Sequence, residues 1–166
     1  KFILCAAQSP CPCGFLGDSV HRCSCKQSEI DSYKRKISGP LMDRIDMQIN
    51  LSRVEFSELK TKEKGESSAA IRERVVKARL VQQQRLEAWG MHCNAQMGRS
   101  EVVKYCQLDA AAQNVMERYF NMLNLSARSH DRILKVARTI ADLAGSKNIE
   151  AVHLAEAIQL RTSVRP

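Results

Sequence analysis

The chain has 166 residues, 44% hydrophobic and 27% charged, a mixture typical of globular domains that excludes a disordered protein. Its net charge of +8 is compatible with polyanionic partners such as nucleic acid, but charge alone fits an ordinary basic domain better. No apolar run approaches the ~20 residues needed to cross a bilayer. We therefore expect a cytoplasmic protein without a membrane partner. Because the chain starts without Met and inside a predicted strand, we expect it to be part of a longer protein.

The first third of the chain predicts short, mixed elements. Phe2–Ala7 is an apolar run typical of a buried strand, and residues 11–25 are rich in Cys, Gly and Pro and should be irregular. Gln27–Lys36 predicts a short helix, and Pro40 can open another that runs through Arg44. Asp46–Leu51 alternates polar and apolar residues and predicts a second strand.

The chain changes character after about residue 57, where a charged stretch with Gly65 indicates a linker. The remainder predicts helices at about Ala69–Trp89, Ser100–Cys106, Asp109–Leu123, Ser126–Ala144 and Glu150–Arg161, with Ser and Asp as N-caps. We therefore predict an α+β, mainly α protein with three parts: residues 1–58, a linker at 59–68, and an all-helical bundle at 69–166.

Four of the seven cysteines fall into two close pairs, Cys11-x-Cys13 and Cys23-x-Cys25. Paired thiolates at this spacing can surround Zn²⁺ tetrahedrally, and a complete shell of four sulfurs favours a structural metal over a catalytic one. Four free thiols or two disulfides are the alternatives. His21 is a possible substitute ligand. The other cysteines, Cys5, Cys93 and Cys106, are expected to be buried or neutral.

The sequence contains no G-x-x-x-x-G-K-[ST] phosphate-binding loop and no acidic strand end of the Walker B type. We therefore expect this chain by itself not to hydrolyse ATP.

Two arginines stand at places suited to phosphate. Arg44 lies between two aspartates at an element end, where it could face a neighbouring molecule, although residue chemistry alone favours a surface ion pair. Arg128 lies in the first turn of a predicted helix, in a row with Arg132 and Lys135. A helix N-terminus with arginines suits phosphate. Periodicity alone favours an ordinary solvated face.

Several strings together resemble the magnesium-chelatase-like AAA+ ATPases of bacteria, in particular the ComM and YifB type. They are AAQSPCPCG at 6–14, ISGPLMDRID at 37–46, GESS at 65–68, LSAR at 125–128 and RILKVARTIAD at 132–142. The strings occur in the family's order and cover nearly the whole chain.

The resemblance implies that residues 1–58 end an AAA+ α/β core and that residues 69–166 form its helical lid. It implies that Ser9, at the end of the first strand, stands at the sensor 1 position, where the family usually has Asn. It also implies that Arg44 is an arginine finger and that Arg128 is sensor 2. The expected cofactors are ATP and Mg²⁺ for the full-length protein and structural Zn²⁺. The expected partners are the protein's own N-terminal AAA+ core, further copies in a hexamer, and DNA.

The function that the resemblance implies is a DNA-remodelling motor of the branch-migration or helicase kind, acting in natural transformation or recombination. One alternative is a magnesium-chelatase-type motor subunit acting on a porphyrin-bearing partner. Another, of a different class, is a non-enzymatic zinc-binding nucleic-acid module.

Overall fold

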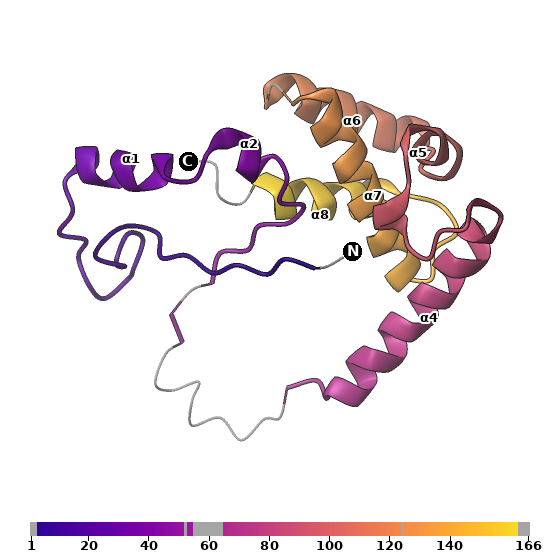
Figure 1. The fold of residues 1–166 in the computed structure, drawn as a ribbon, viewed down its shortest axis with the longest axis horizontal. Helices are drawn as coiled ribbons and strands as arrows, with labels where there is room; N and C mark the ends of the chain where they lie inside the picture. Colours follow the sequence, from indigo (N-terminus) through magenta and orange to yellow (C-terminus); the bar gives the residue numbers. More distant parts are fainter. Residues whose placement is uncertain (1–2, 52, 55–64, 124, 163–166) are drawn as a thin grey trace. The chain divides into compact units, whose positions relative to one another are not determined.

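A computed structural model describes residues 3–51, 53–54, 65–123 and 125–162 (Figure 1). The chain divides into two compact units. Unit 1 comprises Lys1–Ile45 and Leu51–Thr61, and unit 2 comprises Asp46–Asn50 and Lys62–Pro166. Most of the linker expected at 59–68 lies outside the described residues.

Unit 1 consists of an irregular cysteine-rich loop followed by two short helices, α1 (Gln27–Arg35) and α2 (Gly39–Met42). The N–H of Lys26 donates to Glu29 Oε2 at 2.7 Å and so caps the start of α1. Ser38 Oγ accepts from the N–H of Leu41 at 3.3 Å, and Pro40 lies in the first turn of α2. Both predicted helices are therefore confirmed, with slightly shorter bounds.

Neither predicted strand forms in the described part of the chain. Residues 3–7 are exposed and irregular. In the second segment, the Gln48 N–H donates to the Leu160 carbonyl of α8 at 2.6 Å instead of to a strand. A strand exists only through ladder hydrogen bonds to a neighbouring strand, and the described residues offer none. The α+β part of the prediction is thus wrong for this structure, and the mainly α part is confirmed.

Unit 2 is helical. Its elements are α4 (Ser68–Leu86), the 3₁₀ helices η1 (Glu87–Trp89) and η2 (Asn94–Gln96), α5 (Arg99–Tyr105), α6 (Ala110–Met122), α7 (Ala127–Leu143) and α8 (Ala151–Thr162). The predicted N-caps are confirmed: Ser67, Asp109 and Ser126 accept from backbone N–H groups at 3.2, 2.7 and 3.1 Å. Gly145, at φ +70°, follows the C-terminal end of α7 and ends the helix.

Helix α7 runs through the core of unit 2. Ile133, Ala137 and Ala141 are buried and belong to one core cluster with Leu154 and Ile158 of α8. Ala144 and Ala155 are apolar but exposed, so the buried faces of α7 and α8 are narrower than their apolar residues suggest. The core positions α7 rigidly, and with it the N-terminal turn that carries Arg128.

The first turns of α4 extend beyond the other helices of unit 2 (Figure 1), so Ile71 and Val75 are exposed although their stripe continues to the buried Leu86. The same turns carry Arg72, Arg74 and Lys77. Among the described residues, no helix combines the length and the apolar character that a membrane span requires.

Candidate metal centre and phosphate-facing arginines

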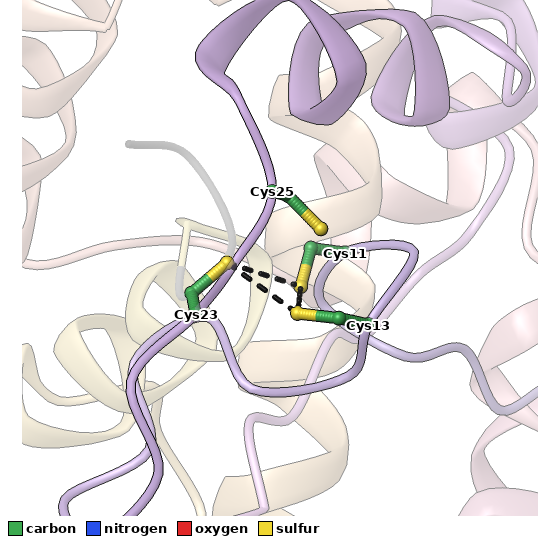
Figure 2. Close-up of side chains that lie close together, drawn as sticks. All are labelled: Cys11, Cys13, Cys23 and Cys25. Atoms are coloured by element: carbon green, nitrogen blue, oxygen red, sulfur yellow. Dashed lines mark hydrogen bonds between the residues drawn. The ribbon is translucent and has the colours of Figure 1, made fainter.

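The four clustered cysteines converge in the loop of unit 1, as Figure 2 shows. The Sγ atoms of Cys11, Cys13 and Cys23 lie 3.4, 3.7 and 3.5 Å apart, and all four Sγ atoms lie within 4.8 Å of one another. Tetrahedral Zn–S bonds of about 2.3 Å place ligand sulfurs about 3.8 Å apart. The cluster therefore has nearly the dimensions of a four-thiolate zinc site.

The loop reaches this shape through turns that the sequence encodes locally. Gly14 and Gly17 both adopt φ +83°, a left-handed conformation that favours glycine, and the Gly14 N–H donates to the Cys11 carbonyl at 3.0 Å. Asp18 Oδ1 accepts from the N–H groups of Val20 and His21 at 2.8 and 2.7 Å. These turns bring the second cysteine pair back over the first.

The sulfurs differ in how readily they lose a proton. Backbone N–H groups of Phe15 and Ser24 lower the pKa of Cys13 to about 5. Burial raises the pKa of Cys25 to about 12. The Cys25 N–H lowers the pKa of Cys23, but burial and the adjacent sulfurs outweigh that effect and raise it. A divalent cation would stabilise every thiolate, so this donor set fits a soft divalent ion such as Zn²⁺.

His21 and the other three cysteines lie outside the four-cysteine cluster. His21 stacks on Phe15 with ring centroids 4.9 Å apart, and its Nδ1 is 2.9 Å from Arg53 Nη1. All seven cysteines are free thiols, which sets aside the two-disulfide alternative for this structure. Cys106 is buried, and burial raises its pKa to about 12, as expected of an inert core thiol. Cys5, in contrast, is exposed.

Arg44 lies directly after α2 in unit 1 and is exposed. Its backbone N–H donates to the Leu41 carbonyl at 2.9 Å, and its Nη1 donates to the Pro40 carbonyl at 2.8 Å. The guanidinium is therefore folded back along α2.

Ser9 lies in the exposed, irregular segment of residues 3–9. Because no strand forms there among the described residues, the structure does not give Ser9 the strand-end position that the family resemblance implies. Its role as sensor 1 stays a prediction.

Arg128 is the second residue of α7 and lines a hollow of about 480 Å³ together with Arg99, Phe120, Ala127, His130 and Asp131. Asp131 forms an ion pair with Arg99 of α5, and its Oδ1 lies 3.1 Å from His130 Nδ1. The His130 ring meets Phe120 edge to face, with centroids 6.2 Å apart. At the N-terminal end of a long helix, which favours anions, the hollow thus places the Arg128 guanidinium beside the Arg99–Asp131 ion pair.

Sequence reasoning did not identify Arg99, His130 or Asp131. His130 and Asp131 follow Arg128 closely, so their polarity was a usable signal, but Arg99 lies on another helix and no local pattern connects it to Arg128. Of the row predicted with Arg128, Arg132 forms an ion pair with Asp46 and Lys135 does not line the hollow. The hollow therefore gathers a different set of residues from the one that helical periodicity suggests.

Comparison with known proteins covers both units. Residues 1–59 match the family model of magnesium chelatase, subunit ChlI, and residues 65–161 match the model of its C-terminal region. The chain is 39% identical over 166 residues to competence protein ComM of Haemophilus influenzae, and 36% identical over 165 residues to the uncharacterized protein YifB of Escherichia coli. An uncharacterized protein of Mycobacterium tuberculosis is 31% identical over 161 residues.

The chain belongs to the magnesium chelatase subunit ChlI family, and its relatives include ComM and YifB. The alignments cover 97 to 99% of the chain but only 31% of each of these relatives, so the chain spans about a third of their length. Membership of this family supports an AAA+ ATPase-type protein.

Proposed function

We propose that this chain is the C-terminal part of an AAA+ ATPase motor that remodels DNA, by branch migration or a helicase-like action, in natural transformation or recombination. The observation that carries the proposal is the 39% identity, over 99% of the chain, to a protein named for competence. The basic charge of +8 agrees with a polyanionic substrate.

In this proposal residues 1–58 complete an AAA+ core and residues 69–166 form its helical lid. The phosphate-binding loop comes from the protein's own N-terminal core, since the 166 residues contain no such motif. Arg128 acts as sensor 2, and its place in the first turn of the long helix α7 supports this role, because a helix N-terminus favours phosphate. ATP with Mg²⁺ supplies the phosphoryl-transfer chemistry when bound.

Arg44 acts as an arginine finger toward a neighbouring copy in a hexameric ring. Its exposure at the end of α2 supports this role, because a finger must leave its own subunit to stabilise charge on another's phosphates. Ser9 is proposed as the sensor 1 hydrogen-bonding group of the same site.

The four-cysteine cluster is proposed to hold structural Zn²⁺ through Cys11, Cys13, Cys23 and Cys25. Converging sulfurs at nearly tetrahedral spacing support this assignment. The ion would fix the loop of unit 1, which otherwise has few buried apolar side chains to order it.

ATP hydrolysis by the intact protein, measured with and without single-stranded and branched DNA, tests the proposal. Strong stimulation by DNA is the expected result. Intact basal turnover without any response to DNA would instead favour the second candidate, a chelatase-type motor acting on a porphyrin-bearing partner. The description of the matching family model favours that candidate. Zinc and DNA binding without any ATP turnover would favour the third, a non-enzymatic zinc module.

A further inference from the structure

The C-terminal end of α1 carries three consecutive cations, Lys34, Arg35 and Lys36, all of them exposed. Among the residues that the structure describes, none of the three forms an ion pair with a carboxylate, although Lys36 Nζ lies 5.9 Å from the Tyr33 ring centroid. The acidic residues of the helix, Glu29 and Asp31, lie in its first half and bond to Lys26 and Gln27. We name Lys34–Lys36 the basic end of α1.

The basic end is tied to the cysteine cluster by a short, ordered connection. A single residue, Lys26, separates Cys25 from the first residue of α1, and the Lys26 N–H is bonded to Glu29 Oε2. Ile30, in the middle of the helix, is buried at 5% exposure. The direction of α1, and therefore the position of its cations, is set at both of these points.

The side chains of α1 indicate which kind of polyanionic partner its basic end can bind. Its aliphatic side chain, Ile30, is buried, and its aromatic side chain, Tyr33, is half-buried with Lys36 Nζ 5.9 Å from the ring centroid. Helix α1 therefore exposes no aliphatic anchor for a bilayer. A phosphodiester backbone needs no such anchor, because charge neutralisation and counterion release supply its affinity.

We infer that the basic end of α1 is a nucleic-acid contact that binds the phosphate backbone without reading sequence. The inference rests on the proposed function only in taking DNA as the physiological nucleic acid. A purely structural alternative is that the cations stabilise the C-terminus of the helix through its dipole. That alternative predicts an effect on stability and none on binding.

The test is fluorescence anisotropy of a labelled DNA duplex titrated with the zinc-loaded 166-residue chain over a salt series. The variant carries Lys34→Gln, Arg35→Gln and Lys36→Gln. Each lost phosphate contact lowers the magnitude of the log–log salt slope by about 0.9, so the variant's slope should fall by about 2.7. Between about 50 and 200 mM salt the wild type should therefore lose roughly 40-fold more affinity than the variant.

The matched control carries Arg72→Gln, Lys77→Gln and Arg79→Gln, which remove the same charge from exposed positions of α4. It should retain the wild-type slope. Equal losses in the two variants would show a general charge effect and overturn the inference. The inference would also be overturned if the α1 variant bound DNA like the wild type, or if the wild-type chain did not bind DNA. Displacement of the DNA by polyglutamate or anionic vesicles at equal charge concentration would overturn it as well. Circular dichroism and zinc content confirm that both variants are folded.

The experiments distinguish a failure of the nucleic-acid contact on α1 from a failure of the proposed motor function. If DNA stimulates ATP turnover of the intact protein but the α1 variant binds DNA normally, the inference falls and the motor stands. If the α1 variant loses binding but DNA does not stimulate turnover, the contact stands and the motor proposal falls.

Discussion

Arg85 and Asp142, 57 residues apart, form a bidentate ion pair that joins α4 to α7. Arg85 Nη1 and Nη2 donate to the two carboxylate oxygens at 2.9 and 2.5 Å, and the Asp142 side chain is fully buried. Asp142 also accepts from Arg138 Nε at 3.1 Å and Asn94 Nδ2 at 2.8 Å. This network holds α7, the helix whose first turn carries Arg128.

Replacing Asp142 with Ala should destabilise unit 2 strongly. The substitution leaves Arg138, itself 3% exposed, without its carboxylate partner, and breaking a buried pair typically costs about 3–5 kcal/mol. Urea unfolding followed by circular dichroism measures the change. The exposed pair of Lys77 and Glu73 is the control: Glu73→Ala should leave the free energy of unfolding almost unchanged, because solvent screens an exposed ion pair. A comparable loss for the two variants would contradict the importance of the network.

The reduced chain, purified with zinc present, should hold one zinc ion per molecule. Cys23→Ser should lose most of it, because three sulfurs no longer complete the shell. Cys5→Ser, which changes an exposed thiol outside the cluster, should keep it. Mass spectrometry of the wild type and both variants measures the number of zinc ions per chain. Less than about half a zinc per wild-type chain would remove the four-ligand site.

Arg44→Ala in the intact protein should lower ATP turnover by about 10³-fold, the scale at which arginine fingers act. Because an arginine finger acts on a neighbouring copy, mixing this variant with one inactive at its own phosphate-binding loop should restore part of the activity if Arg44 has that role. Wild-type turnover in Arg44→Ala would exclude the finger.

If Arg128 acts as sensor 2, Arg128→Ala in the intact protein should also lower turnover, by about 10²- to 10³-fold, because it removes a positive charge that would stabilise phosphate in the transition state. Arg118→Ala is the matched control, since Arg118 is exposed on α6 and does not line the hollow. Arg99→Ala should weaken nucleotide affinity if the whole hollow contacts phosphate. Equal turnover in the Arg118 and Arg128 variants would argue against sensor 2.

Glu101 should make the stability of unit 2 depend on pH. Its carboxylate accepts from Ser100 Oγ at 2.5 Å and Gly98 N–H at 2.6 Å, and the pKa of Glu101 is lowered, first by the Ser100 hydrogen bond. Because the folded pKa lies below the unfolded value of about 4.3, this stabilisation is present above pH 4.3 and disappears as the pH falls through the folded pKa.

Urea unfolding of the wild type and Glu101→Gln at neutral and acidic pH checks this expectation. The wild type should be the more stable at pH 7, and the difference should shrink on acidification. A constant difference would mean that the carboxylate charge contributes nothing.

Local sequence signals determined most of the helices and the four-cysteine cluster. Ser67, Asp109 and Ser126 satisfy the N–H groups that every helix start exposes, so they marked the starts of α4, α6 and α7 correctly. The cysteines could be paired from spacing alone because Gly14 and Gly17 turn the chain within the loop itself. These features depend on neighbours in the sequence.

Tertiary structure decided the rest. The runs at residues 2–7 and 46–51 have the composition of strands, but a strand needs a partner's hydrogen bonds, and a sequence pattern does not show whether a partner is present. Arg99 joins Arg128 at one hollow only because α5 packs on α7. Likewise Arg138 and Asp142 are buried charges that a periodicity argument assigns to solvent. They lie inside because Arg85 and Asn94, distant in sequence, neutralise and hydrogen-bond them there.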